Sequence, residues 1–219
     1  TLPLTLFPYT TLFRSKNSEG DLIIFSAPSG AGKSTIIKKI IDLSDGAIEL
    51  SISATTRKPR HGEKEGIDYF FISNQEFDSL KESNAFLENA IVHGEQYGTL
   101  KSFVEEKTKK GSHLILDIDV QGFEQIKNKI KSIKSIFIIP PSFNELKERL
   151  LARDLDTVES IERRLLNAKK ELEYAQHFSY LVLNEDFDEA VEQIFNIILN
   201  DEYKFTDDRI SNLLNELLD

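Results

Sequence analysis

Short apolar runs alternate with amphipathic stretches along most of this chain. Runs with the length and apolar character of buried strands occupy residues 22–26, 113–118, 135–139 and 181–183. Between them, Ile36, Ile37, Ile40 and Ile41 recur at the spacing of one helical face, which predicts a helix over residues 34–43. Strands that alternate with helices predict an α/β fold with a parallel sheet at its core.

The second half of the chain carries further helical patterns. A long helix is predicted with its apolar positions at Ile161, Leu165, Ala168, Leu172 and Ala175. Residues 187–199 form an amphipathic helix, and a last apolar stripe comprises Ile210, Leu213, Leu214 and Leu217. The last stripe predicts either packing on the core or a contact between two copies of the chain. Ser142 with Glu145 predicts a capping box after the third apolar run.

The stretch from about residue 48 to residue 97 breaks this alternation. Its predicted elements are a strand at 48–53, a charged loop at 55–68, a short strand at 69–72, a helix at 74–82 and a strand at 86–92. Gly94 and Gly98 are expected in turns. We predict that this stretch is a small subdomain inserted into the α/β core.

Length and composition fit a single domain with additions at both ends. The chain has 219 residues, 40% of them hydrophobic and 29% charged, which is ordinary for a globular domain. We assign residues 21–200 to the domain and residues 201–219 to a helical C-terminal extension. Residues 1–20, which are apolar at first and broken by Pro3 and Pro8, are interpreted as a leader foreign to the fold. A partner-binding tail is the alternative.

Charge and cysteine usage narrow the classes of function. The chain has 27 basic and 37 acidic residues, a net charge of −10, which argues against a general nucleic-acid or anionic-membrane binder. The sequence has no run of about 18 apolar residues that would span a bilayer. It has no cysteine, so disulfides, thiolate catalysis and cysteine zinc sites are excluded. Such a chain is compatible with the reducing cytoplasm, where we expect it.

The strongest chemical motif lies between the first apolar run and the first helix. It comprises Ala27, Pro28, Ser29, Gly30, Ala31, Gly32, Lys33 and Ser34, followed by Thr35. The pattern G-x-x-x-x-G-K-[ST] of phosphate-binding loops is matched except at Ala27. Gly30 and Gly32 allow the backbone N–H groups to curl around an anion, and the helix that follows adds its positive end. Lys33 is expected to reach the β- and γ-phosphates of a nucleotide, and Ser34 to bind Mg²⁺.

A plain Gly-rich turn is the alternative for this motif, but the buried strand before it and the amphipathic helix after it favour the phosphate loop.

A second motif, which is acidic, follows another apolar run. Asp117 and Asp119 are two residues apart, so we expect both side chains on one face of a strand, reaching the same cleft. In P-loop proteins an Asp at such a strand end supports Mg²⁺, a role we assign to Asp117. Capping of the next turn is the alternative.

Several separated motifs together resemble the guanylate kinase family. They are SAPSGAGKST at 26–35, SISATTRKPRHGEKEGIDYFF at 51–71, FLENAIVHGEQYGT at 86–99, LILDIDVQG at 114–122 and RLLARDLDTVESIERRL at 149–165. The resemblance covers about residues 21–200. It implies a P-loop NTPase-type three-layer α/β fold with a parallel sheet core, an inserted GMP-binding subdomain at about 48–97 and a helical lid at about 145–170. The activity it implies is phosphorylation of GMP or dGMP by ATP with Mg²⁺, in purine nucleotide metabolism.

The resemblance also implies roles for individual residues. ATP would be bound by the loop residues 28–35, with Arg153 and, near the adenine ring, Asn184. The GMP phosphate would be held by Arg57, Arg60, Tyr69 and Tyr97. Guanine would be read by Ser53, Glu88, Thr99 and Asp119. The transferred phosphoryl group would be surrounded by Lys33, Arg57, Arg149 and Arg164. Guanidinium groups pair bidentately with phosphate oxygens, and a buried carboxylate accepts from the N1–H and the N2 amine that guanine presents and adenine lacks.

One departure from the family and two rival functions remain. Asp154 stands where the family commonly has Gly, which leaves the turn of the lid and the reach of Arg153 open. A non-catalytic binding module of the same fold typically has a degraded phosphate loop, whereas Lys33 is present here. A kinase of the same fold that acts on a ribose bisphosphate should lack the guanine-reading residues, whereas Glu88 and Thr99 are present.

Overall fold

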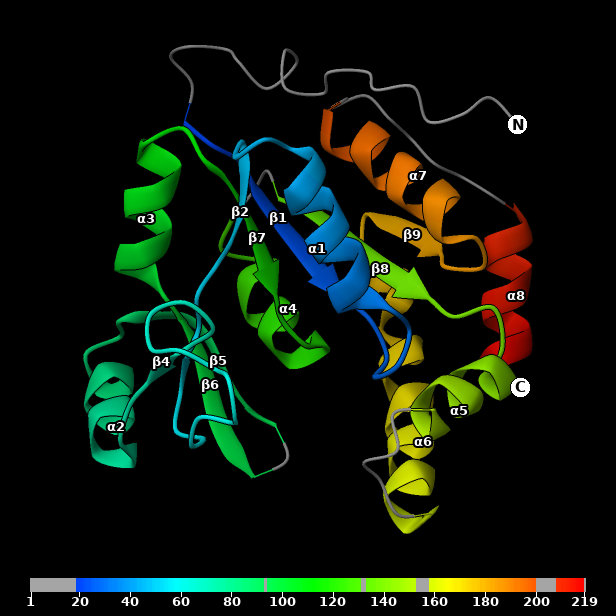
Figure 1. The fold of residues 1–219 in the computed structure, drawn as a ribbon, viewed down its shortest axis with the longest axis horizontal. Helices are drawn as coiled ribbons and strands as arrows, with labels where there is room; N and C mark the ends of the chain where they lie inside the picture. The colour runs from blue at the N-terminus through cyan, green and yellow to red at the C-terminus, as the bar shows by residue number, and fades with distance from the viewer. Residues whose placement is uncertain (1–18, 93, 131–132, 153–157, 200–207, 219) are drawn as a thin grey trace.

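A five-stranded parallel sheet forms the centre of the computed structural model, which describes residues 19–92, 94–130, 133–152, 158–199 and 208–218 (Figure 1). The order of its strands is β2-β7-β1-β8-β9. The strands are β1 (Leu22–Ser26), β2 (Ile48–Leu50), β7 (His113–Asp117), β8 (Lys134–Ile139) and β9 (Tyr180–Leu183). All of their pairings are parallel, with Ile23 opposite Ile115 and Phe25 opposite Ile136. Most of the expected leader, together with Arg153 and Asp154, lies outside the described residues.

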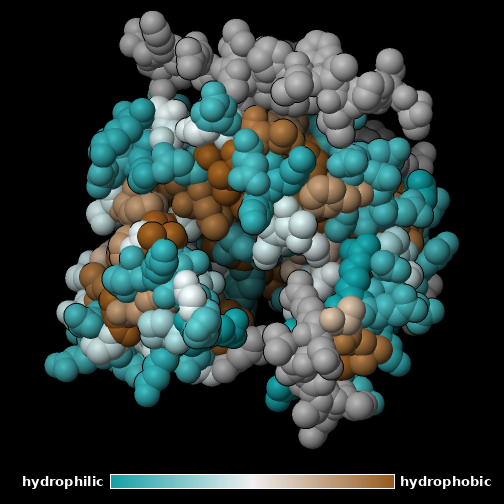
Figure 2. Space-filling view, in the orientation of Figure 1, coloured by the Kyte–Doolittle hydropathy of each residue, from teal (hydrophilic) through white to brown (hydrophobic). Residues whose placement is uncertain are grey.

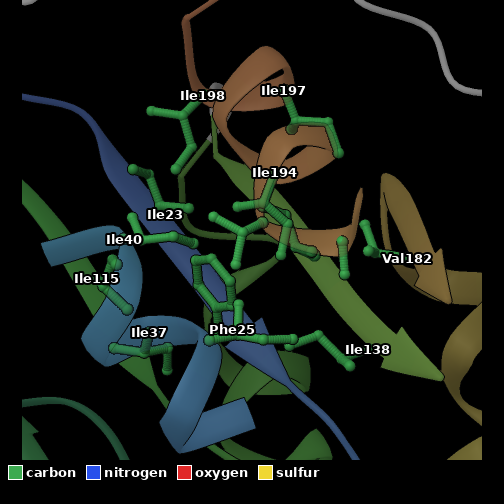
Figure 3. Close-up of a cluster of buried hydrophobic side chains, with 14 of the residues drawn as sticks. Ile23, Phe25, Ile37, Ile40, Ile115, Ile138, Val182, Ile194, Ile197 and Ile198 are labelled. Carbon is green, nitrogen blue, oxygen red and sulfur yellow. The ribbon is translucent and has the colours of Figure 1, made fainter. Parts of the chain in front are cut away.

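Helices cover both faces of this sheet because its strands are apolar on both sides. On β1, Ile23 and Phe25 belong to one buried cluster and Ile24 to the other. Helices α1 (Lys33–Leu43) and α7 (Phe187–Leu199) cover the first face, as Figure 3 shows. Helices α4 (Val120–Ile126) and α8 (Asp208–Leu218) and the end of α6 (Val158–Glu173) cover the second. The expected three-layer α/β fold is therefore confirmed.

The residues between β2 and β7 form a second, four-stranded sheet, at the lower left of Figure 1. Its order is β4-β3-β6-β5, and its strands are β3 (Ala54–Thr55), β4 (Phe70–Phe71), β5 (Phe86–Val92) and β6 (Glu95–Leu100). Helix α2 (Asn74–Glu82) packs on it through Phe77, whose ring stacks on Phe86 with the centroids 4.5 Å apart. Gly98, expected in a turn, lies inside β6, where a Cβ atom would come within 2.8 Å of the Phe86 ring.

Helix starts differ from expectation at several places. The Ser142 hydroxyl accepts from the Glu145 N–H at 3.0 Å before α5 (Phe143–Leu151). The Glu145 carboxylate, however, accepts from Arg149 Nε at 3.1 Å, so only half of the predicted capping box forms. A complete capping box, which we did not predict, joins Ser73 and Glu76 at the start of α2. Helix α3 (Lys101–Lys109) was also not predicted.

The final apolar stripe packs on the chain itself. Ile210, Leu214 and Leu217 of α8 are buried in the cluster that contains Leu172 of α6. Of the two readings of this stripe, packing on the core is therefore confirmed. A short 3-10 turn, η2 (Ala175–His177), joins α6 to β9. Within the described part of the chain, no helix combines the length and the apolar character needed to cross a membrane.

Candidate functional site

The loop between β1 and α1 has the backbone shape of a phosphate cradle. Gly30 and Gly32 have φ values of 95° and 94°, the left-handed region that favours glycine. Helix α1 begins directly after Gly32, and no described side chain caps this end. Its first N–H groups therefore point into the loop, where the positive end of the helix favours an anion.

Asn184, at the end of β9, supports this loop from behind. Its Nδ2 donates to the Ala31 carbonyl at 2.7 Å, and its own carbonyl accepts from Arg149 Nη2 at 3.3 Å. A Cβ atom on Gly32 would lie 2.3 Å from Asn184 Nδ2, so the loop and Asn184 fit together only with glycine there. Arg149 of α5 and Asn184, the residue that follows β9, are thus brought together beside the loop.

Lys33, Ser34 and Asp117 meet in front of the loop. Lys33 Nζ forms an ion pair with Asp117 at the end of β7, and Ser34 is exposed at the start of α1. A cavity of about 280 Å³ is lined by loop residues 27–30 and 32–34 with Val92, Asp117, Asp119 and Glu171. Hydroxyl and carboxylate oxygens are the ligands that Mg²⁺ prefers, so Ser34 and Asp117 fit a magnesium site there.

A second cavity of about 250 Å³ lies between the two sheets. It is lined by Lys33, Ser53, Tyr69, Glu88, Ala90, Val92, Tyr97, Asp117, Ile118 and Asp119. Lys33, Asp117 and Asp119 also line the loop cavity, so the two form one continuous cleft. Figure 2 shows the molecule hollowed between the inserted sheet and the α5–α6 region, with hydrophilic side chains along the hollow. The structure therefore unites most of the phosphate and guanine residues expected from the sequence.

Glu88 is the most buried carboxylate of this cleft. It is 4% exposed, and its Oε1 accepts from the Thr99 hydroxyl at 2.6 Å. Burial raises the pKa of Glu88 to about 7, against the hydrogen bond from Thr99, and the negative charge of Asp119 adds to the rise. Thr99 is itself 1% exposed, so it reaches the cavity through Glu88. A carboxylate held this way suits a ligand that offers N–H donors.

Asp119 is placed differently from our expectation. Strand β7 ends at Asp117, and Asp119 is the N-cap of α4, where its Oδ1 accepts from the Gly122 N–H at 2.9 Å. Its Oδ2 accepts from Gln121 Nε2 at 3.0 Å. The strand periodicity we used does not extend past Asp117, because the helix start turns the chain. Both carboxylates nevertheless line the same cavity.

Arg57 is held by a carboxylate and three rings. Its Nη1 and Nη2 donate to the two oxygens of Glu63 at 3.0 and 2.9 Å, and its Nε donates to the Tyr97 hydroxyl at 3.2 Å. The guanidinium carbon lies 5.2 Å from the centroid of the Tyr69 ring and 5.9 Å from that of Phe71. The hydrogen bond from Arg57 lowers the pKa of Glu63, and burial raises the pKa of Tyr69. Arg57 does not itself line the cavity, but it contacts Tyr69 and Tyr97, which do.

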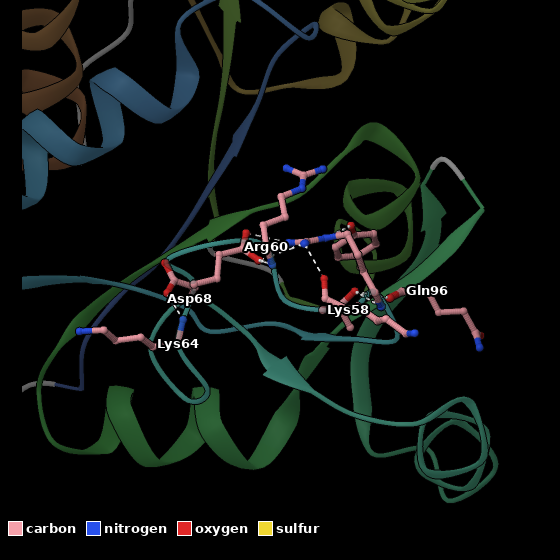
Figure 4. Close-up of polar contacts among 9 residues, drawn as sticks. Lys58, Arg60, Lys64, Asp68 and Gln96 are labelled. Carbon is pink, nitrogen blue, oxygen red and sulfur yellow. Dashed lines mark hydrogen bonds and ion pairs between the residues drawn. The ribbon is translucent and has the colours of Figure 1, made fainter. Parts of the chain in front are cut away.

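Arg60 joins this group only through its backbone. Its N–H donates to Glu63 at 2.7 Å. Figure 4 shows the Arg60 side chain extending away from the other contacts of the loop, in which the Lys64 N–H donates to Asp68. Arg60 does not line the cavity between the sheets, whereas Tyr69 and Tyr97 do. Arg153 lies outside the described residues.

Two carboxylates of the site escaped the sequence reasoning. Glu63 holds Arg57, and Glu171 on α6 lines the cleft beside Ser29. A third cavity of about 330 Å³ places Arg164, Asn167 and Glu171 along one side of α6. The spacing of these residues could have indicated Glu171, because a residue seven positions after Arg164 lies on the same face of a helix. No such periodicity pointed to Glu63, which lies in an irregular loop.

Comparison with known proteins gives a consistent result. The sequence model of a family described as guanylate kinase matches residues 19–201. The chain is 47% identical over 183 residues to the guanylate kinase of Fusobacterium nucleatum subsp. nucleatum, covering 84% of this chain and 98% of that protein. It is 43% identical over 188 residues to the guanylate kinase of Thermotoga maritima, covering 86% and 90%. The crystal structure of guanylate kinase from Anaplasma phagocytophilum superposes with a TM-score of 0.67 at 33% identity, covering 83% of this chain and 86% of that one.

Proposed function

The chain belongs to the guanylate kinase family, and on that premise we propose that its cleft transfers the γ-phosphoryl group of ATP to GMP. One observation carries the proposal. The phosphate loop and the cavity with the buried carboxylate Glu88 share Lys33, Asp117 and Asp119, so a donor triphosphate and an acceptor nucleotide would meet end to end. We propose the cytoplasm, expected from the sequence, as the place of this reaction, and dGMP as a second acceptor.

We assign the reading of guanine to Glu88, with Thr99, Ser53 and Asp119 around it. Guanine presents two N–H donors on the edge where adenine presents a lone pair. The Glu88 oxygens would accept from both donors, while adenine would leave a buried acceptor unpaired, which costs about 1–3 kcal/mol. Thr99 keeps the Glu88 carboxylate oriented through its 2.6 Å hydrogen bond.

We assign the acceptor phosphate to Arg57, Tyr69 and Tyr97, with Arg60 arriving by rotation of its exposed side chain. Arg57 already lies against both tyrosines, so a phosphate would replace Glu63 as the partner of its guanidinium fork. The second pKa of such a phosphate is about 6, so it is largely dianionic at neutral pH and needs no general base.

We assign the donor side to loop residues 28–35, with Arg149 and Asn184 behind them. Lys33 would leave Asp117 for the β- and γ-phosphates, and Ser34 and Asp117 would hold Mg²⁺. The metal supplies charge neutralisation at the phosphate oxygens. Lys33, Arg57, Arg149 and Arg164 would surround the phosphoryl group, since phosphoryl transfer depends on positioning and charge more than on covalent help. Closure over the cleft would exclude water that otherwise hydrolyses ATP.

The test is a panel of acceptors. GMP, dGMP, AMP and ribose 1,5-bisphosphate are each supplied with ATP and Mg²⁺, and ADP release is followed with a coupled assay. Turnover with GMP and dGMP and near-background rates with the others support the proposal. A preference for the bisphosphate would transfer the function to sugar phosphates, and binding without turnover would make the protein a binding module.

Lys33→Ala is expected to lower the turnover number for GMP at least about a hundredfold, because the amine neutralises charge on the travelling phosphoryl group. The matched control is Lys38→Ala, an exposed lysine on the same helix, which should keep the wild-type rate. Circular dichroism of both variants checks that α1 remains folded. A near-normal rate for the Lys33 variant would remove the phosphate-loop assignment.

A further inference from the structure

Glu171 places a carboxylate where the phosphate loop would receive a nucleotide. The side chain is half-buried, and the backbone of Ser29 lies close enough to favour its charged form. Glu171 lines two cavities, one with the loop and Lys33, the other with Arg164, Asn167 and Val92. A carboxylate of the protein itself therefore lies in the cavity where this loop would bind an anion.

The charges around Glu171 come from several elements. Lys33 of α1 attracts its negative charge and Asp119 of α4 repels it, while burial raises its pKa to about 7. Asp117 lines the loop cavity with it, and Arg164 and Lys170 of its own helix line the other. A triphosphate bound in this loop would add several negative charges next to the carboxylate, so the two anions would compete for the same cavity.

The position of Glu171 points to the terminal phosphate as its competitor. The cavity beside α6 contains Val92 and Asp119, which also line the guanine cavity. Glu171 thus lies on the side of the loop that faces the acceptor nucleotide. The donor phosphate closest to the acceptor is the γ-phosphate, because it is the group that is passed on.

We propose that Glu171 is a positioning residue that stands in for the γ-phosphate of ATP, lying in the loop cavity beside Ser29 in the ligand-free protein and moving out of it when the triphosphate binds. The inference rests on the proposed function. Arg164 precedes Glu171 by two turns, and both residues line the cavity beside α6.

The test measures nucleotide affinity without acceptor. Glu171→Gln removes the charge and keeps the size, and Mg²⁺-ATP and Mg²⁺-ADP are titrated into nucleotide-free protein by calorimetry. The Kd for ATP is expected to fall about tenfold, because a like charge at close range is removed, while the Kd for ADP changes less than about twofold. The matched control, Glu173→Gln, alters an exposed carboxylate on the same helix and should change neither value.

A purely structural role of Glu171 predicts no gain in ATP affinity. If Glu171 only shapes the loop, the Gln variant binds ATP with unchanged or weaker affinity, and that result overturns the proposal, as does an equal gain for ADP. Glu171→Ala is the second variant, since alanine suits a helix interior and also removes the acceptor; a gain confined to ATP is expected again. The assay contains no GMP, so its outcome is separate from the acceptor panel, in which wild-type protein alone tests the kinase assignment.

Discussion

At the scale of residues, the cleft neutralises its own cations before any ligand arrives. Lys33 pairs with Asp117, and Arg57 pairs with both oxygens of Glu63. In the function we propose, ligand binding is therefore an exchange of partners, in which phosphate must be a better acceptor than the carboxylate it replaces. A dianionic phosphate with three oxygens meets this condition, and a single carboxylate does not. Such an exchange discriminates between anions as well as attracting them.

Glu88→Gln is expected to lower kcat/KM for GMP by about a hundredfold, because the amide offers one acceptor where two N–H donors need partners. The affinity for ATP should change less than about twofold, since Glu88 lies in the inserted sheet and does not line the loop cavity. Steady-state kinetics for GMP and calorimetry for ATP measure the two effects. Equal losses for both nucleotides would contradict guanine reading by Glu88.

The same variant, Glu88→Gln, tests the raised pKa of this carboxyl through the pH dependence of the free energy of unfolding. The pKa of Glu88 is about 7 in the folded protein, against an ordinary value of 4.5, so the folded state binds more protons than the unfolded state between these values. Stability from this group is therefore full below about pH 4.5 and is lost as pH rises through about 7. Between about pH 5 and pH 8, Glu88→Gln should gain up to about 3 kcal/mol relative to wild type.

Denaturant unfolding of both proteins at the two pH values checks this gain. Glu171, whose pKa is also raised to about 7, titrates in both proteins and cancels from the difference. A stability difference that does not vary with pH would show that Glu88 keeps an ordinary pKa.

At the scale of elements, the phosphate loop depends on a glycine fitted against another strand. Gly32 has both a left-handed φ and a Cβ position blocked by Asn184 Nδ2, which itself bonds to Ala31. The blocked position explains why the N-cap of α1 is not one of the usual Ser, Thr, Asp or Asn residues. The helix start is instead left open for a ligand.

Gly32→Ala and Gly46→Ala separate the effect of backbone strain from the effect of the contact with Asn184. Both glycines have left-handed φ values, 94° and 81°, but a Cβ atom on Gly46 meets nothing within 4 Å. Each variant should lose about 1–2 kcal/mol of stability through backbone strain. Only Gly32→Ala should also lose ATP binding, measured by calorimetry, because its Cβ displaces Asn184 from the loop. Equal ATP affinity in the two variants would show that the contact with Asn184 is unimportant.

Elements with strong periodicity were predictable from the sequence, and those shaped by partners were not. The bounds of α2 and β5 agree with the predictions, because the local pattern of apolar and polar residues marks both elements. Strand β6 was missed because Gly98 reads as a turn, although it makes room for Phe86. Helix α4 was missed because its start depends on Asp119 as a cap and its interior contains Gly122. The loop motif marked Lys33, whereas Glu171 reaches Ser29 from a helix far along the chain.

At the scale of the whole molecule, α8 connects helix α6 to the central sheet. It packs against α6, which carries Arg164, and against β9 in the central sheet. The matched family region ends at residue 201, so this helix lies beyond it. Its three buried side chains make it part of the core rather than an appendage.

Leu214→Ala is expected to lower the free energy of unfolding by about 2–5 kcal/mol, because a buried leucine side chain is replaced by a cavity. Leu214 is 8% exposed, while its neighbour Asn215 is exposed, so Asn215→Ala is the control, with an effect within about 0.5 kcal/mol. Chemical denaturation measures both. Equal stability of the two variants would mean that α8 detaches from the core in solution.

The order of the central sheet also governs how the molecule is assembled. Leu22 of β1 pairs with Leu114 and Ile23 pairs with Lys134, so both neighbours of this strand are synthesised long after it. Every residue of the inserted sheet lies within the loop that must close before β1 is enclosed, and such distant pairings are slow to form. We therefore expect the loop between β1 and α1 to take its final shape late in folding. A chain interrupted before β8 would contain every residue of this loop but would lack β8, one of the two strands that flank β1.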